Sequence, residues 1–311
     1  MNAHSRTPNA AVAMTLLSLA TTSAAALAQT PAPNKGMDYV SIDTQADTQH
    51  NQQVLTTVSA AVGRHAWVQA GLGKSHSDQL ADAHHPGIAA AGLGWTSHSW
   101  QVALNTSQRS DSRRYRQTDW GSSLDWRNDG GHVGLDITRR RSSMSGSVAV
   151  NNAPDSPSIA VPAQEWLSGT GLGAHGVAQV NGHVSVYGSV ARNHYESSVR
   201  QAHPTTPGGP IASLPVLART LLGVPAVVNL DEVALVHCAL LGATYRWTKV
   251  AVSSEYQAGQ LYGNGGAMRS LNLKAAIDVA PGWRVAPGLG RGTSDQGGHA
   301  TFASLSAMYG W

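Results

Sequence analysis

Charge, cysteine and phenylalanine are all scarce in this sequence of 311 residues. Only 13% of the residues are charged, whereas soluble domains approach about 25%. The chain therefore lacks the charged surface expected of a cytosolic enzyme. The single cysteine, Cys238, excludes an intramolecular disulfide and builds no metal site by itself. A net charge of only +3 gives no support to a nucleic-acid partner.

Long apolar runs are absent as well. Beyond the N-terminus no stretch of about 18 apolar residues occurs, and the mean hydropathy of −0.19 is too polar for a bundle of membrane helices. Disorder is excluded by the 41% of hydrophobic residues and by nine tryptophans. An ordered chain remains, whose apolar residues are distributed without long runs.

The N-terminal segment has the features of a secretory signal. It carries one basic residue, Arg6, an apolar stretch from Ala10 to Leu19, and a small-residue end at Ala26-Leu27-Ala28. We expect residues 1–28 to be a cleaved signal peptide, followed by a short segment at 29–36.

The rest of the chain alternates apolar and polar residues with a period of two, which is typical of strands with two different faces. The clearest case sets Leu271, Leu273 and Ile277 against Asn272 and Lys274. Fourteen such strands are predicted, at 37–46, 54–62, 66–75, 86–96, 100–109, 116–127, 132–141, 166–179, 183–194, 231–247, 249–260, 268–279, 283–292 and 300–311.

Connections between these segments alternate in length. Short turns, such as those at 128–131 and at Asn181-Gly182, contain residues whose backbone readily takes positive φ. Longer segments, including 142–165 and 195–230, separate the hairpins. Tight turns at one end and loops at the other are the layout of an outer-membrane barrel, with periplasmic turns and extracellular loops.

Tryptophans support this topology. Seven of the nine lie within about four residues of a short turn or of the C-terminus, beside Tyr245 and Tyr309. They are Trp67, Trp95, Trp100, Trp126, Trp247, Trp283 and Trp311. A ring of amphipathic aromatic side chains belongs at a membrane interface, so we interpret it as the periplasmic girdle. By its position in the alternation, Trp67 falls on the opposite, polar face of its strand.

The last segment, Leu305-Ser306-Ala307-Met308-Tyr309-Gly310-Trp311, resembles the C-terminal assembly signal of Gram-negative outer-membrane β-barrel proteins. That class normally ends in Phe, and here Trp311 takes its place. The resemblance implies an all-β fold, a transmembrane antiparallel up-and-down β-barrel over residues 37–311. The count of alternating segments gives it fourteen strands, with twelve to sixteen possible. The resemblance also implies recognition of Tyr309 and Trp311 by the barrel-assembly machinery.

Charged and amide side chains occupy the predicted inner face. Fourteen strands exceed the roughly eight whose side chains fill a barrel, so an aqueous space is expected. The predicted pore-lining residues are Asn105, Arg109, Asp125, Arg127, Asp136, Arg246, Glu255, Asn272, Lys274, Asp278 and Arg284. These side chains either tune solute selectivity or form neutralising pairs that brace the barrel.

Residues 211–230 are unusually apolar for a loop. A short helix over Leu214–Leu222 is predicted, with Ser213 as its cap and Gly223 at its end. The segment either folds into the barrel mouth as a constriction or plug, or lies over the rim.

Arginines gather near two neighbouring loops. On one side of the mouth, Arg109 lies near six arginines that are predicted to bind anions or lipopolysaccharide. These are Arg113, Arg114, Arg116, Arg139, Arg140 and Arg141. Guanidinium groups suit phosphates, so the cluster either binds lipopolysaccharide or attracts anionic solutes, or is simply solvated.

Catalytic and metal sites are disfavoured. His183-Val184-Ser185 is the best nucleophile–base pair, but it follows a periplasmic turn and faces the lumen rather than lipid. Histidines and aspartates between His76 and His85 lie in one solvated loop whose spacing fits no rigid site. No cofactor, metal site or enzymatic activity is expected.

The sequence therefore predicts an outer-membrane channel, porin-like, for passive or gated diffusion of small solutes or ions. The alternative is a non-conducting barrel that binds lipopolysaccharide or another envelope component, and a barrel lipid hydrolase is a more distant one. The expected partners are outer-membrane lipids, lipopolysaccharide and the barrel-assembly machinery.

Overall fold

The computed structural model describes most of the chain beyond the N-terminal region. The described residues are 38–48, 51–76, 86–111, 115–150, 159–201, 235–262, 266–295 and 299–311. The predicted signal peptide, the segment 29–36, the predicted helix Leu214–Leu222, Arg113 and Arg114 lie outside them. No helix among the described residues is both long and apolar enough to cross a membrane.

Fourteen strands make up the described fold. They are β1 (Tyr39–Asp47), β2 (Gln52–Val62), β3 (Ala66–His76), β4 (Gly87–Thr96), β5 (Trp100–Ser110), β6 (Tyr115–Asn128), β7 (Gly131–Val150), β8 (Ile159–Gln179), β9 (Val184–Gln201), β10 (Leu235–Arg246), β11 (Val250–Leu261), β12 (Ala267–Ala280), β13 (Trp283–Ser294) and β14 (His299–Gly310). Every strand predicted from the period-two pattern is present.

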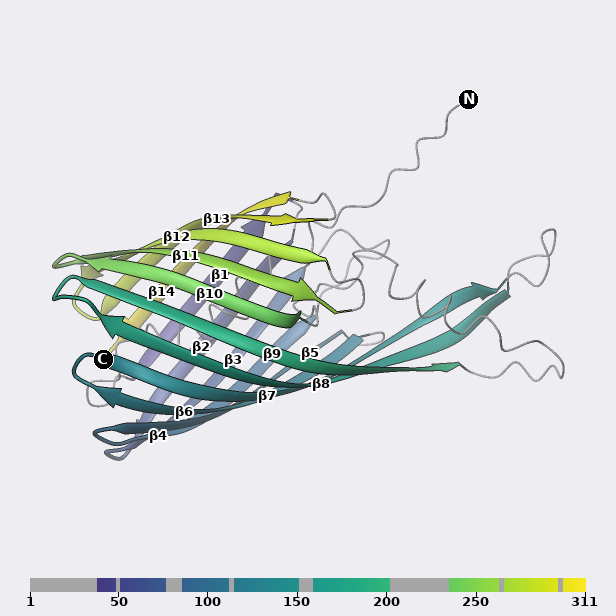
Figure 1. Ribbon diagram of the computed structural model, residues 1–311, viewed down its shortest axis with the longest axis horizontal. Coiled ribbons are helices and arrows are strands. Elements are labelled where there is room, and N and C mark those ends of the chain that lie inside the picture. Colours follow the sequence, from purple (N-terminus) through teal and green to yellow (C-terminus); the bar gives the residue numbers. More distant parts are fainter. Residues whose placement is uncertain are drawn as a thin grey trace, which may run out of the picture.

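The strands form one closed antiparallel barrel (Figure 1). Each strand pairs with its neighbours in sequence, and β1 pairs with β14 from Tyr39 opposite Gly310 to Asp47 opposite Phe302. Closure gives every edge a backbone partner, which hydrocarbon requires because it offers no water to unpaired amides. The predicted fold class is confirmed.

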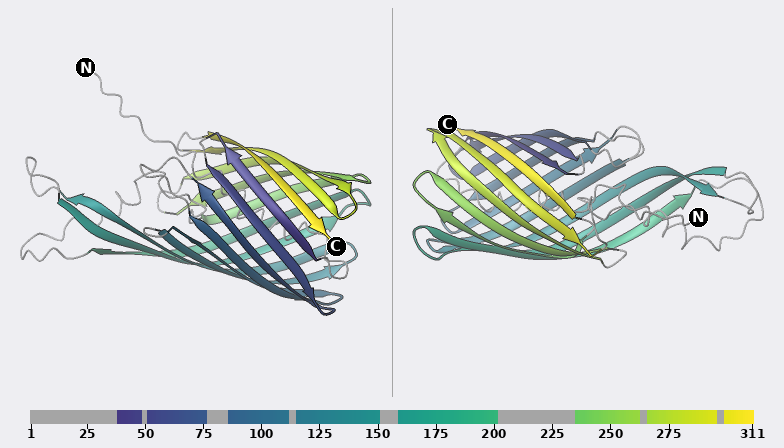
Figure 2. Two further views of the ribbon diagram at one scale, coloured as in Figure 1. Left: turned by 180° about the vertical axis from the view of Figure 1, so that it is seen from behind. Right: turned by 90° about the horizontal axis from the view of Figure 1, so that it is seen from above.

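Three strands are longer than predicted. β7, β8 and β9 continue past their neighbours at one end of the barrel, where Figures 1 and 2 show them as a projecting ribbon. Their pairing runs as far as Val150 opposite Ile159. The predicted bounds were 141, 166 and 194. For β7 the sequence after Arg141 reads Ser-Ser-Met-Ser-Gly-Ser, which has no apolar face. Backbone pairing continues there without the alternation that a lipid-facing strand needs.

The connections at the other end of the barrel, which we call the turn end, are all short, and the long ones lie at the opposite end, which we call the loop end. Gly63 and Gly282 occupy their turns with φ of 73° and 77°. At the predicted Asn181-Gly182 turn, Gly182 does not take positive φ. Instead the Asn181 side chain accepts hydrogen bonds from the amides of His183 and Val184 at 2.8 and 2.9 Å. The turn is where the sequence placed it, but a side chain closes it.

The two faces of the barrel differ in chemistry. Leu72, Leu172 and Leu241 on the outer face are 71%, 63% and 67% exposed. The inner face carries buried polar side chains such as Gln117 and Gln257. Apolar outside and polar inside is the arrangement of a barrel that faces lipid.

Tryptophans gather on the outer face at the turn end, as predicted for six of the seven. Those six are Trp95, Trp100, Trp126, Trp247, Trp283 and Trp311. Ring contacts join neighbours in this belt, including Tyr245 with Trp247 at 4.4 Å and Trp283 with Tyr309 at 4.9 Å between centroids. Trp67 instead lies on the inner face, over Gly94, so it does not belong to the belt.

Inner-face aromatic rings lie over glycines of neighbouring strands. Tyr195 lies over Gly169, Tyr187 over Gly242, and Phe302 over Gly290. A Cβ at each glycine would overlap the ring, so the glycine is required by its neighbour's side chain. This pairing fills the interior and explains part of the high glycine content.

Candidate functional site: the inner face and the outer rim

All eleven predicted pore-lining residues occupy inner-face positions of their strands. Most of those with described contacts join networks. Near the turn end Arg284 contacts Asp278, with the guanidinium Nε donating to Oδ1 at 2.7 Å. On β11 Glu255 accepts a hydrogen bond from Asn272 Nδ2 at 3.3 Å and one from the Tyr187 hydroxyl at 3.5 Å. These charges therefore brace the wall as well as line it.

Asp125 and Asp136 meet through His175 of β8, which was not among the residues predicted to line the pore. Its Nε2 lies 2.6 Å from Asp125 Oδ1 and its Nδ1 lies 2.6 Å from Asp136 Oδ2. Asp125 pairs with Gly134 on β7, and Gly134 pairs with His175. A Cβ at position 134 would lie 2.6 Å from the His175 ring, so the glycine makes the space that the ring occupies.

A second network lies nearer the loop end, on β6 and β7. Arg140 Nε donates to Asp119 Oδ1 at 2.8 Å. Gln117 Nε2 donates to the same carboxylate at 2.6 Å, and Gln117 Oε1 accepts from the Tyr115 hydroxyl at 2.6 Å. The sequence showed Asp119 only as an alternating polar position and gave no sign that Arg140 would be its partner.

Burial of inner-face side chains is uneven along the barrel. The most buried ones, Gln117, Gln257, Met268, Ser270 and Ala300, are at most 3% exposed and all lie in the half nearer the loop end. We call this the loop half. At the turn end, the Arg284 and Asp278 side chains are 32% and 46% exposed. The tightest packing is therefore in the loop half, while toward the turns buried side chains such as Asp125 stand beside more open ones such as Arg284.

The predicted arginine cluster is divided between the two faces. Arg140 points inward to Asp119, whereas Arg116, Arg139 and Arg141 have the parity of the outer face and are exposed. The prediction that all of these guanidiniums meet at one side of the mouth was wrong for Arg140, because consecutive strand residues face opposite sides. Arg139 pairs across to Trp120, which lies on the outer face.

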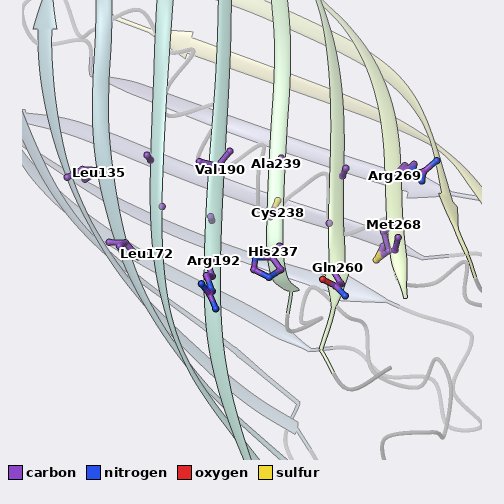
Figure 3. A pocket seen from close by; sticks show the side chains of 16 residues that line it. Leu135, Leu172, Val190, Arg192, His237, Cys238, Ala239, Gln260, Met268 and Arg269 are labelled. Atoms are coloured by element: carbon purple, nitrogen blue, oxygen red, sulfur yellow. The ribbon is translucent and has the colours of Figure 1, made fainter. Parts of the chain in front are cut away.

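A groove of about 730 Å³ runs along the outer face from β7 to β12 (Figure 3). Small side chains such as Ala174, Ala239 and Ala258 form its floor. Toward the loop end it is bordered by a cross-strand row of polar residues. In that row Arg192 pairs with His237, and His237 with Gln260. The groove combines an apolar surface with a polar edge.

The candidate catalytic pair is arranged differently from a nucleophile and its base. His183 Nδ1 lies 3.0 Å from the carbonyl oxygen of Arg246, and its ring stacks on Tyr245 at 6.0 Å between centroids. The imidazole is therefore engaged at the turn, away from Ser185.

Comparisons with protein-family models and with curated proteins gave no match. Solved structures do match in fold. The CymD monoaromatic hydrocarbon channel is 10% identical with a TM-score of 0.51, and the match covers 89% of this chain and 88% of the CymD chain. The Pseudomonas putida toluene transporter TodX is 9% identical with a TM-score of 0.50, covering 90% of each chain. The translocator domain of the Neisseria meningitidis autotransporter NalP is 10% identical with a TM-score of 0.48, covering 94% of each.

With a closed fourteen-strand barrel, an apolar outer face and the likeness to CymD and TodX, the fold is that of the outer-membrane β-barrel proteins of Gram-negative bacteria.

Proposed function

We propose that the protein is a porin-like outer-membrane channel for passive or gated diffusion of small solutes or ions. The observation that carries this proposal is the polar and charged inner face of a barrel whose outer face is apolar. Side chains of that kind serve a water-filled path, because buried charges without water or partners are costly. Fourteen strands give more circumference than the roughly eight that side chains alone fill.

The proposed solutes are polar. CymD and TodX are described as a hydrocarbon channel and a toluene transporter, but here the described inner face carries Glu255, Lys274, Asp278 and Arg284. Such a wall favours ions and hydrated molecules over aromatic hydrocarbons.

Solute flux across the membrane of proteoliposomes tests this function. Purified barrel, refolded into vesicles, should release a trapped small sugar and dissipate a potassium gradient. The same preparation unfolded by heat before reconstitution serves as the control. Vesicles that hold correctly folded barrel yet stay as tight as the control would refute the channel.

A non-conducting barrel that binds lipopolysaccharide is the second candidate, and the outer-face arginines favour it. Arg116, Arg139 and Arg141 lie just beyond the apolar outer positions of β7, where lipid phosphates would meet them. The triple variant Arg116→Ala/Arg139→Ala/Arg141→Ala should retain less lipopolysaccharide after purification. Arg284→Ala, on the inner face, is the matched control. Equal retention by both variants would exclude this role.

We propose further that the turn end faces the periplasm, that no enzymatic activity resides in the barrel, and that the barrel-assembly machinery recognises Tyr309 and Trp311. Trp311 adjoins the closure between β14 and β1, where its amide donates to the Asp38 carbonyl at 3.1 Å. Removal of Trp311 should lower the amount of folded barrel in the outer membrane, whereas Trp100→Ala should not.

A further inference from the structure

We propose that Asp125, His132 and His175 form a binding site for a borderline divalent cation such as zinc on the inner face of the barrel. The three residues come from adjacent strands β6, β7 and β8. Each offers one ligand atom, and these atoms lie within 4.8 Å of one another. Ligands of one tetrahedral ion at about 2 Å each stand about 3.3 Å from one another, so small side-chain rotations would bring these atoms to coordinating distance.

Rings and backbone are arranged to bring these atoms together. The His132 and His175 rings stand 5.9 Å apart between centroids at an interplanar angle of 69°, so neither blocks the other's edge. Gly134 lies between Asp125 and His175 in the cross-strand row, and its missing side chain opens the space that they share.

Asp136 holds one of the ligands of such a site in position. Its carboxylate lies 2.6 Å from Nδ1 of His175. A carboxylate that accepts from one ring nitrogen fixes the tautomer and directs the other nitrogen toward the ligand-binding side. That other nitrogen, Nε2, is the one that faces Asp125 at 2.6 Å. Asp136 is therefore a positioning residue, and His175 is the ligand.

The donor set selects the class of ion. Two imidazole nitrogens with one carboxylate oxygen suit zinc and its first-row neighbours, whereas calcium and magnesium prefer oxygen ligands alone. Three protein ligands leave a fourth position for water or an anion. Because all three side chains project inward, this open position faces the barrel interior.

Arg127 adds an independent observation beside the site. It pairs with His132 across the strands, and its Nε and Nη1 are buried without a hydrogen-bond partner among the described residues. Buried guanidinium donors are rarely left unpaired. An anion on the fourth position of the ion would accept from them and offset the added positive charge.

His175 can exchange a proton for the ion. Short contacts to two carboxylates require a proton on each ring nitrogen, since a neutral imidazole has only one N–H to donate. A cation that binds Nε2 replaces that proton, which leaves to water, while the Nδ1 proton stays on the ring and keeps its hydrogen bond to Asp136. The ion thereby takes over the charge that the imidazolium held between the carboxylates.

Cobalt titration of the full-length, detergent-refolded barrel tests the site. Co²⁺ substitutes for zinc and gives strong visible absorption in tetrahedral sites. The wild type should bind one equivalent with a tetrahedral spectrum that excess Zn²⁺ abolishes. His175→Ala and His132→Ala should each weaken binding at least tenfold, and Asp136→Asn about 10–100-fold. Heat-modified gel mobility confirms that each variant is folded.

A matched control separates this site from the histidine-containing loop. His84→Ala/His85→Ala, which leaves the three ligands in place, should bind cobalt as the wild type does. The proposal is overturned if the wild type gives no tetrahedral spectrum. It is equally overturned if the loop variant loses binding while His175→Ala and His132→Ala keep it. The result is independent of whether the barrel conducts.

Discussion

Two ion pairs of nearly equal length stand in very different surroundings on the inner face. In the loop half Arg140 contacts Asp119 at 2.8 Å, with side chains 19% and 28% exposed. At the turn end Arg284 contacts Asp278 at 2.7 Å, with side chains 32% and 46% exposed. Judged by these distances alone, the two pairs would be expected to contribute equally to stability. Their surroundings separate them, because the cost of an unpaired charge depends on how much water can reach it.

Loss of Asp119 is the largest expected effect. Asp119→Ala leaves the Arg140 guanidinium and the Gln117 amide without their shared acceptor, and should lower the free energy of unfolding by about 2–3 kcal/mol. Urea unfolding of the refolded barrel in lipid vesicles measures this. The double variant Asp119→Ala/Arg140→Met also removes the guanidinium and should recover part of the loss. A stability equal to that of the wild type would remove the distinction between the two halves.

An intermediate loss of stability is expected when a glycine beneath an aromatic ring of the loop half is replaced. Gly169→Ala places a methyl group against the Tyr195 ring and should cost roughly 1–3 kcal/mol. Gly87→Ala, where the nearest atom to a new Cβ is 3.9 Å away, is the matched control and should be close to neutral. Equal unfolding midpoints for the two variants would show that the ring does not need its glycine.

Disruption of the turn-end pair should have the smallest effect. Asp278→Ala should change stability by less than about 1 kcal/mol, because solvent screens both side chains. The difference from wild type should shrink further in high salt. A loss as large as that of Asp119→Ala would show that the turn half is as tightly packed as the loop half.

Much of this fold could be predicted from the sequence because each lipid-facing strand must alternate. Leu271, Leu273 and Ile277 alternate with Asn272 and Lys274, and that pattern fixes both the strand and the face of each residue. Turn positions followed from their residue types. The same parity rule correctly set Trp67 apart from the other tryptophans of the belt.

Contacts between strands could not be predicted in this way. Asp125 and His175 are 50 positions apart in sequence, and only the register of β6, β7 and β8 brings them within 2.6 Å. The ends of β7, β8 and β9 were missed for a related reason. Beyond Arg141 the backbone ladder persists after the apolar alternation has stopped. Periodicity shows which face a residue takes, while register decides which residues meet.

The most direct test of the account is single-channel conductance in planar bilayers, which asks whether the barrel conducts and whether its loop half limits the current. Wild-type barrel should give discrete steps. Met268→Ala/Phe302→Ala, which removes packed side chains from the loop half, should give larger steps, while Arg284→Ala at the turn end should leave their size nearly unchanged. Folded, inserted barrels that give no steps, or steps that respond to Arg284→Ala alone, would contradict it.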